Sequence, residues 1–141
     1  MVDASLRATI LGSLRQLNQE RRISIIYITH DLATAYQVAD DIIVMYRASV
    51  AEAGDVELVV KAPKHPYTQL LIASVPQVST ERTWLDEQEG SRRTDAGDDG
   101  CRFFDRCPVS LPVCAGVVPP PVRTEPGRIV ACHRHTVAAA P

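Results

Sequence analysis

The sequence predicts an α/β fold, in which helices cover a partial, mostly parallel sheet and a small, loop-rich, cysteine-containing module follows. Two observations predict the α/β part: apolar residues recur at helical spacing near the start, and short β-branched runs follow them. A third observation predicts the module, because all four cysteines fall after residue 100. A chain of 141 residues is long enough for one domain with such an appendage.

Helical and strand patterns alternate through the first 77 residues. Four aliphatic residues, three or four positions apart, mark the first helix. Two short β-branched runs have the character of buried parallel strands, and an alternating run has that of an edge strand. In chain order the sequence predicts a helix over residues 4–21, a strand over 23–28, a helix over 31–40, strands over 41–46 and 49–54, and helices over 55–60 and 67–75.

Composition divides the chain into four parts. Residues 1–77 are patterned and globular, and residues 78–100 are polar, with the composition of a flexible linker. Residues 101–135 hold every cysteine and most of the prolines, and residues 136–141 form a tail. We expect these parts to correspond to an α/β core, a linker, a cysteine-rich module and a frayed end.

Charge and hydropathy exclude several classes of function. The formal net charge of −2 gives no reason to expect a nucleic-acid partner. The longest strongly apolar run, residues 42–46, is too short to cross a bilayer, and the first ten residues lack the apolar core of a signal peptide. We therefore expect a cytoplasmic chain that does not insert into a membrane.

A histidine follows the first predicted strand at a position where α/β sheets often carry their chemistry. His30 comes shortly after the run "ISIIYI" and directly before Asp31 and the next predicted helix. On spacing alone two interpretations stay open. The imidazole could hydrogen-bond a carbonyl of the next turn, or it could orient a water or a phosphate oxygen.

Three stretches resemble one family, the ATPase subunits of ABC transporters. The run "SIIYITHDLATAYQVADDIIVMYRASVAEAG" is similar to the part of that family in which a strand ends in a switch histidine and a later strand carries "MY.G.IVE.G". The opening "VDASLRATIL" resembles the family's D-loop. The run "KHPYTQLLIASVPQ" resembles the segment after the ATPase core in the oligopeptide and dipeptide importer branch. The resemblance covers about residues 1–77 and resumes over residues 100–135.

The resemblance implies a function, partners and two site residues. The chain would be the C-terminal part of the ATP-binding subunit of a peptide importer, in which ATP hydrolysis drives peptide uptake. His30 matches the switch histidine, which contacts the γ-phosphate and the attacking water. Asp3 matches the D-loop aspartate at the interface between two ATPase subunits, whereas without the resemblance it would be a plain helix cap. The implied partners are a second ATPase subunit and membrane permease subunits, at the cytoplasmic face of the inner membrane.

The ATP-binding motifs of the family have no match in this sequence. It contains no "GxxxxGK[ST]" loop, no LSGGQ-type signature and no apolar strand ending in Asp-Glu. ATP and Mg²⁺ therefore belong to the intact parent, and we expect the isolated chain neither to bind ATP tightly nor to hydrolyse it. The chain is interpreted as a C-terminal fragment. The alternatives are a non-catalytic metal-binding interaction module and a decayed gene remnant.

The cysteine segment is too short to fold on apolar contacts alone and needs a cross-link. Two disulfides are disfavoured in a reducing cytosol. Structural zinc is possible if His133 or His135 joins a mixed site, and a [4Fe–4S] cluster takes four thiolates. Spacing leaves these possibilities open. The four cysteines, with five, six and seventeen residues between them, are Cys101, Cys107, Cys114 and Cys132.

This segment also resembles the cysteine-bearing extension of the peptide-importer ATPases, whose pattern runs "GC.F..RCP......C......P........H.VACH". In some members that extension resembles an iron–sulfur binding region, which implies the four cysteines as metal ligands in a structural or regulatory role. His133 would then pack beside the site. Arg102, Arg106 and Arg128 would offset the charge of the thiolates or be solvated. The matching positions are Gly100, Cys101, Phe103, Arg106, Cys107, Pro108, Cys114 and residues 130–133.

Overall fold

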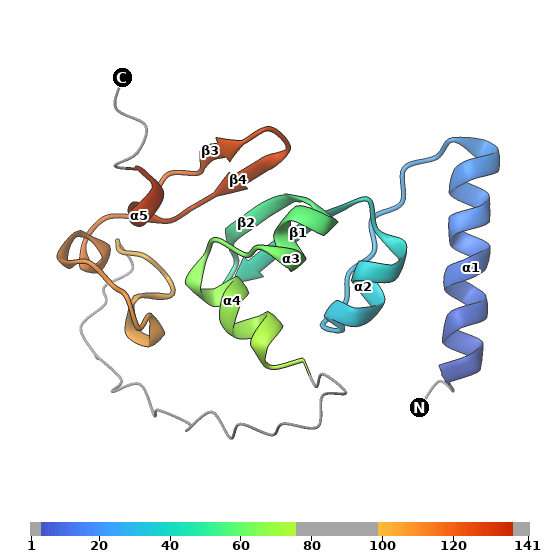
Figure 1. Ribbon diagram of the computed structural model, residues 1–141, viewed down its shortest axis with the longest axis horizontal. Coiled ribbons are helices and arrows are strands. Elements are labelled where there is room, and N and C mark those ends of the chain that lie inside the picture. The colour runs from blue at the N-terminus through green and yellow to red at the C-terminus, as the bar shows by residue number, and fades with distance from the viewer. Residues whose placement is uncertain (1–3, 76–98, 137–141) are drawn as a thin grey trace. The chain divides into compact units, whose positions relative to one another are not determined.

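The computed structural model describes residues 4–75 and 99–136 (Figure 1). Asp3, nearly all of the predicted linker and residues 137–141 lie outside the described residues. The chain divides into two compact units, Met1–Asp40 and Asp41–Pro141. No helix in the described ranges is both long enough and apolar enough to span a membrane.

The first unit is a pair of helices. Helix α1 (Ala4–Arg21) confirms the helix predicted over residues 4–21, and α2 (Leu32–Val38) occupies most of the range predicted for the next helix. Two polar contacts join the pair: Arg7 Nη1 lies 3.2 Å from Asp31 Oδ2, and Arg15 Nη1 donates to the carbonyl of Gln37 at 3.2 Å. Most of the apolar face of α1 is exposed, because this unit supplies little apolar surface to cover it.

The strand predicted over residues 23–28 is wrong for this structure. These residues have no regular secondary structure, and the side chains of Ile26 and Ile28 are 90% and 92% exposed. A parallel strand forms only when neighbouring strands pair with its backbone. Among the described residues no strand pairs with this segment, so its apolar, β-branched sequence forms no ladder.

The second unit is built on an antiparallel sheet of four strands, so the prediction of a mostly parallel sheet is wrong. The strand order is β1-β2-β4-β3, and every neighbouring pair is antiparallel. Two-residue turns at residues 47–48 and 126–127 join the strands of each hairpin, and so short a connection permits only antiparallel pairing. The strands are β1 (Asp41–Tyr46), β2 (Ser49–Asp55), β3 (Val122–Glu125) and β4 (Arg128–Val130).

Two details of the strand predictions also change. The alternating strand predicted at the sheet edge, β2, lies in the interior of the sheet between β1 and β4. The strand predicted to be buried on both faces, β1, lies at the edge, where Val44 is 5% exposed and Ile43 is 65% exposed. Pairing with β4 causes the first difference, because it covers the outer side of β2 with a strand distant in sequence. The second arises because no described strand pairs with the other side of β1.

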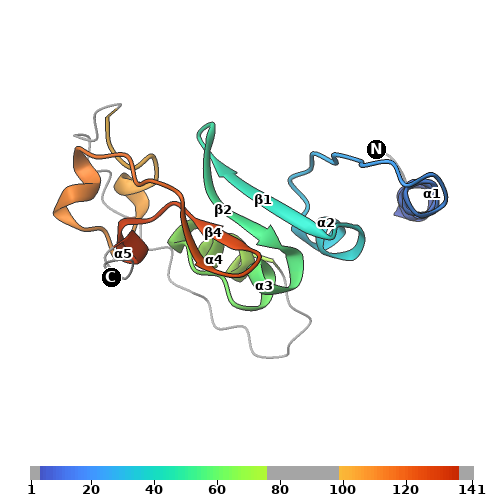
Figure 2. The same cartoon turned by 90° about the horizontal axis from the view of Figure 1, so that it is seen from above.

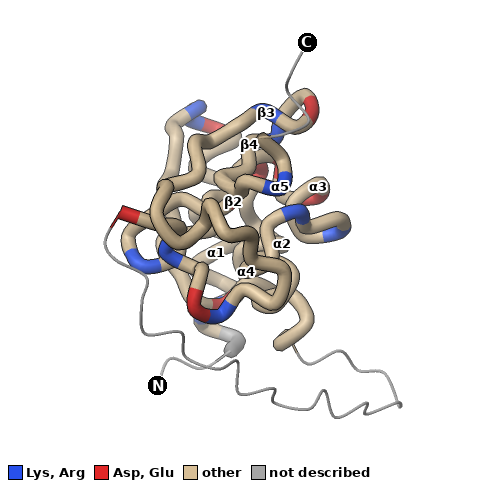
Figure 3. The backbone as a smooth tube through the Cα atoms, turned by 90° about the vertical axis from the view of Figure 1, so that its left-hand side faces the viewer, with Lys and Arg blue, Asp and Glu red and all other residues tan. Residues whose placement is uncertain are grey.

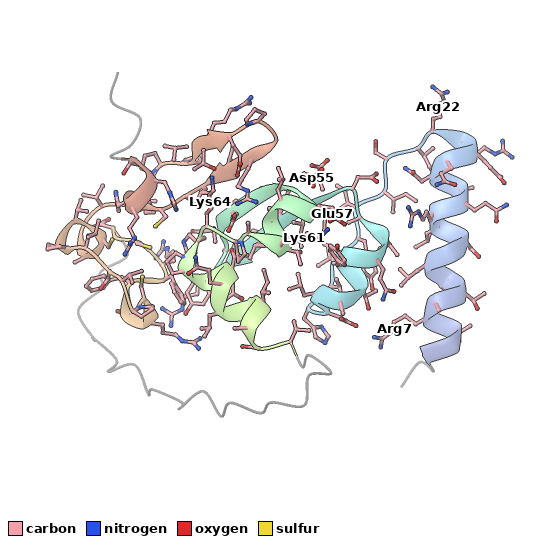
Figure 4. The ribbon with its side chains drawn as sticks, viewed as in Figure 1. Arg7, Arg22, Asp55, Glu57, Lys61 and Lys64 are labelled. Carbon is pink, nitrogen blue, oxygen red and sulfur yellow. The ribbon has the colours of Figure 1, made fainter. Side chains whose placement is uncertain are left out.

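Two helices cover one face of the sheet (Figure 2). Asp55 caps the start of helix α3 (Val56–Lys61), since its carboxylate accepts hydrogen bonds from the N–H groups of Glu57 and Leu58 at 2.9 and 3.2 Å. An ion pair between Glu57 and Lys61 follows on its surface (Figure 4). Helix α4 (Pro66–Ala73) begins at His65. Both confirm the helices predicted over residues 55–60 and 67–75.

The cysteine segment is not confirmed as a separate module, because its β3–β4 hairpin completes the sheet. Pairing of Glu52 with Val130 and of Gly54 with Arg128 joins β2 to β4. Gly54 is required at this junction, since a Cβ there would lie 2.1 Å from the carbonyl oxygen of Gly127. The rest of the segment holds η1 (Phe104–Arg106), η2 (Pro112–Ala115) and α5 (His133–Thr136).

A buried ion pair connects the sheet to the loop before α4. Glu52 and Arg128 are 0% and 2% exposed, and Arg128 Nη1 lies 3.5 Å from Glu52 Oε1. Arg128 therefore contacts a carboxylate of β2 and is buried, so the prediction that it is solvated is wrong. Acidic and basic positions also lie close together along β3 and β4 (Figure 3). Lys64, in the loop before α4, faces this hairpin and lies 3.0 Å from Glu125 (Figure 4).

The β1–β2 turn carries backbone strain. Arg47 and Ala48 have φ angles of +45° and +61°, the left-handed conformation that a two-residue hairpin turn requires. A Cβ disfavours this conformation by roughly 1–2 kcal/mol. Ala48 stands where the resembling family usually has glycine, so the turn geometry is retained here at the expense of stability.

We predict that Ala48→Gly stabilises the second unit by about 0.5–1 kcal/mol, because glycine adopts φ = +61° without steric cost and loses part of that gain to its greater chain entropy. Urea unfolding followed by far-ultraviolet circular dichroism measures the change. Ala51→Gly, in β2, is the matched control and is expected to destabilise. A lower free energy of unfolding for Ala48→Gly than for the wild type would contradict the presence of backbone strain at Ala48.

Candidate functional site

His30 is exposed and lies in a bend immediately before α2. The structure therefore places it ahead of a helix, as predicted, but not at the end of a strand, since residues 23–28 form none. His30 belongs to the first unit, whereas all four cysteines belong to the second. Asp3, the other residue matched to the ATP site, lies outside the described residues.

The residue after His30 fixes the start of α2. Asp31 Oδ1 accepts the N–H of Thr34 at 3.2 Å, and its Oδ2 accepts the Thr34 hydroxyl at 2.6 Å. These bonds, first from the Thr34 hydroxyl and then from its N–H, lower the pKa of Asp31 despite partial desolvation, and Arg7 adds to the effect. The Asp31 N–H in turn donates to Thr29 Oγ1 at 3.0 Å. The backbone on both sides of His30 is thus held, while its imidazole is open to solvent.

The four cysteines gather in the second unit, and all are free thiols. Cys101 and Cys107 are half-buried on either side of η1, Cys114 is buried within η2, and Cys132 is buried between β4 and α5. Burial raises the pKa of three of these thiols, and negative charge on neighbouring thiolates adds to the rise.

Each of the four sulfurs also has a backbone N–H directed at it. The N–H of Leu111 lies 3.4 Å from Cys114 Sγ. For the other three cysteines, N–H groups lower the thiol pKa and so oppose the effect of burial. Such donors stabilise thiolates and are a feature of sites that hold metal through sulfur. The donors are Phe103 and Phe104 to Cys101, Val109 to Cys107, and Arg134 to Cys132.

A glycine allows two of the cysteine segments to touch. The N–H of Cys101 donates to the carbonyl of Cys114 at 2.8 Å. A Cβ on Gly100 would lie 2.5 Å from the Ala115 oxygen and 2.7 Å from the Cys114 oxygen, so only glycine fits there. The match of Gly100 to the family pattern therefore has a steric reason.

The remaining histidines of this segment contact carbonyl groups. His133 is buried, and its Nε2 lies 2.9 Å from the Val117 oxygen, whereas His135 Nε2 lies 3.3 Å from the Lys64 oxygen. Within the described ranges, no three His, Cys, Asp or Glu side chains stand close enough together to surround a single metal ion.

Sequence analysis missed the residues that hold the cysteine segment against the rest of the unit. His65 is 3% exposed, and its Nδ1 accepts the N–H of Tyr67 at 3.0 Å, which caps α4. Phe103 is 2% exposed and lies against the rings of Tyr46, His65 and Tyr67. The dipeptide His65-Pro66 was a usable signal for a helix start, since proline favours the first helical position. Nothing local identifies Phe103 as a partner of α4.

Comparison with known proteins identifies relatives of the whole chain. Residues 51–114 match the family described as the oligopeptide/dipeptide transporter, C-terminal region. A probable peptide ABC transporter ATP-binding protein of Sinorhizobium fredii is 38% identical over 99% of the chain. An oligopeptide transport ATP-binding protein of Bacillus subtilis is 36% identical over 93% of it, and a dipeptide transport ATP-binding protein of Escherichia coli is 34% identical over 94%. The chain spans 40%, 40% and 41% of the lengths of these relatives.

We predict that the stability of the second unit falls as the pH drops from about 6.5 to about 4. Burial, and then the positive charge of nearby His135, lower the pKa of His65 from 6.5 to about 4. Between these values the unfolded chain binds a proton at His65 that the folded chain does not. The contribution of neutral His65 to the free energy of unfolding, on the order of 3 kcal/mol, is therefore complete above pH 6.5 and lost at pH 4.

Urea unfolding between pH 4 and 7.5 measures this dependence. His65→Asn keeps a side-chain acceptor for the helix cap and removes the titration, so its stability profile is expected to be flatter. His30→Asn, at an exposed histidine, is the matched control and is expected to follow the wild type. Identical profiles for His65→Asn and wild type would contradict the assignment.

Proposed function

Because this chain belongs to the oligopeptide and dipeptide transporter family, whose C-terminal region it carries, we propose that it serves as the C-terminal part of the ATP-binding subunit of a peptide importer. The observation that carries the proposal is that three peptide-transport ATP-binding proteins are similar to this chain and that each similarity extends over 93–99% of the chain's length. ATP hydrolysis on the complete subunit would drive peptide uptake through membrane permease subunits. A second ATPase subunit would complete the assembly at the cytoplasmic face of the membrane.

In this proposal His30 acts on the terminal phosphate of ATP. Its imidazole is exposed, and Asp31 holds the backbone beside it at the start of α2. That arrangement leaves the ring free to hydrogen-bond a γ-phosphate oxygen and to orient the attacking water. Asp3 would contribute at the interface between the two ATPase subunits. The phosphate-binding loop and the Mg²⁺ ligands must come from sequence other than these 141 residues.

The chain on its own would therefore have no ATPase activity. A histidine can stabilise part of the charge that develops during phosphoryl transfer, but it cannot replace the cradle of N–H groups and the metal. We expect the purified chain to show no magnesium-dependent ATP turnover on its own.

The four cysteines would hold a [4Fe–4S] cluster, with zinc as the alternative. What supports a cluster is the donor set, four free thiols in one segment of the unit, although in this structure no three of them stand close enough together to surround a metal ion. A bound cluster would supply positive charge that favours the thiolate form of the cysteines and so opposes the effect of burial on their pKa. It would also cross-link η1, η2 and the end of β4. Its role would be structural or regulatory. The ligands would be Cys101, Cys107, Cys114 and Cys132.

The importer proposal is tested with a chimaera. This chain replaces the matching part of the E. coli dipeptide transport ATP-binding protein, and ATP-dependent dipeptide uptake is measured in cells that lack the native subunit. We predict that the chimaera supports uptake and that His30→Ala reduces its ATPase rate about 100-fold or more, as loss of one transition-state contact typically does. Tyr27→Phe, at another exposed position of the same segment, is the control.

A chimaera that assembles with the permease and binds ATP but supports no uptake would contradict the importer function. If that chain still bound metal, the function as a non-catalytic metal-binding module would be favoured. An ATPase rate unaffected by His30→Ala would remove His30 from the site while leaving the importer assignment intact.

The cluster is tested by metal analysis of the chain purified without oxygen. We predict about four iron and four sulfide per chain, and a loss of both when Cys107→Ser removes one ligand. Val109→Ala keeps the N–H beside Cys107 and is expected to retain the cluster. Stoichiometric zinc, or free thiols with no metal, would contradict the cluster.

A further inference from the structure

Strand β1 lies at one edge of the four-stranded sheet, and among the described residues no strand pairs with its outer side (Figure 2). An edge strand directs a row of N–H and C=O groups outward, and another strand can bind them. Prolines, bulges and charged side chains usually block such pairing. In β1, "DIIVMY", only Asp41 at one end is charged, and none of the residues is proline. The register shift opposite β1 adds its extra residue, Ala51, to β2, so β1 itself stays regular.

The side chains of β1 alternate between the covered and the open face of the sheet. Val44, 5% exposed, lies opposite Glu52, whose carboxylate accepts the N–H of His65 before α4, so Val44 belongs to the face that the helices cover. Ile43 and Met45 point to the other face and are 65% and 56% exposed. Two large apolar side chains thus lie next to each other along the edge strand. Exposed apolar surface of this kind is typical of an interaction site.

Opposite charges lie at the two ends of this strand. Asp41 is exposed at its start, and Arg47, whose side chain is 61% exposed, comes directly after its end. Arg47 Nη1 lies 3.7 Å from Asp105 Oδ2, and the guanidinium has further N–H donors for a second carboxylate. A strand that begins with an acidic residue and is followed by a basic one is complementary in charge to an antiparallel copy of itself.

One register of such a pair satisfies the faces, the apolar side chains and the charges together. When two copies of β1 pair antiparallel around Val44, Ile43 of each copy lies opposite Met45 of the other. Asp41 of each copy then lies opposite Arg47 of the other. The opposed residues share one face, so both copies keep their helices on the same side of the joined sheet. A slip by one residue would place exposed Ile43 opposite buried Val44, so the side-chain pattern selects this register.

We propose that the outer edge of β1 binds a second copy of this chain, so that two four-stranded sheets join into one continuous sheet around a twofold axis at Val44. Such an interface is isologous, and every contact occurs twice. Two pairs of Ile43 with Met45 flank the axis, and two pairs of Asp41 with Arg47 close its ends. The pairing requires neither ATP nor a metal, so it is independent of the proposed function. Two edge strands bury little surface, and we expect a dissociation constant on the order of 10 µM.

Sedimentation equilibrium of the full chain over a range of concentrations tests the interface. We expect the wild type to show a monomer–dimer equilibrium. Met45→Lys places a charge opposite Ile43 of the other copy and is expected to raise the dissociation constant at least about 10-fold. Ile129→Lys is the matched control, at an exposed apolar position of β4 on the same face of the sheet. It lies away from the edge and is expected to change the dissociation constant by less than about 3-fold.

An exchange of charges tests the register. Asp41→Arg alone, or Arg47→Asp alone, places like charges opposite each other at both ends of the interface and is expected to weaken the dimer about 10-fold. The double variant restores opposite charges and is expected to return the dissociation constant to within about 3-fold of the wild type. Circular dichroism checks that each variant keeps its fold. In the wild type, isotope-filtered NMR of an equal mixture of labelled and unlabelled chain is expected to show Ile43 methyl protons close to those of Met45 in the other copy.

Three results would overturn the proposal. The first is a wild type that stays monomeric well above the expected dissociation constant. The second is a dimer that Ile129→Lys weakens as much as Met45→Lys, since that result indicates contact between the open faces and not between the edges. The third is a monomer whose β1 binds the N-terminal part of the E. coli dipeptide transport ATP-binding protein and loses it on Met45→Lys. That result would assign the edge to a different partner while leaving the importer assignment intact.

Discussion

The buried pair of Glu52 and Arg128 is the interaction on which the second unit depends. Besides facing Arg128, Glu52 accepts the N–H of Lys64 at 3.1 Å and that of His65 at 2.9 Å. Arg128 Nη1 donates to the carbonyl of Ala62 at 2.6 Å. One ion pair thus satisfies the backbone of the loop before α4 and joins it to β2 and β4. Removing one partner would leave an unpaired buried charge, which typically costs roughly 3–5 kcal/mol.

The position of the cysteines follows from this constraint. Because Arg128 fixes β4 beside β2, Cys132 is placed at the end of the sheet, and because Glu52 fixes the loop before α4, His65 and Tyr67 are placed to receive Phe103. A metal site in this segment would be supported by the sheet and by α4 and not by its own short sequence. The family match begins in β2 and ends at Cys114, so it includes Glu52 and the loop before α4 but ends before β4.

Much of the local structure could be predicted from the sequence. Helix α1 follows from its apolar spacing, and the short helices α2, α3 and α4 follow from pattern and from capping residues such as Asp31 and Asp55. The position of His30 before a helix was also readable from the order of residues, as was the grouping of four cysteines. The partners of Phe103 and Glu52 could not be predicted from the sequence, because these partners lie far away along the chain.

By itself, the sequence determined the family, the helices, the absence of a phosphate-binding loop from these 141 residues and the identity of the four thiols. These properties reside in single residues or in short windows, where propensity and spacing suffice. Only the tertiary structure decided the antiparallel strand order, the exposure of residues 23–28 and the burial of Arg128. The physical reason is that a strand and a buried charge are each stable only with a partner, and partners are chosen by contacts between distant parts of the chain.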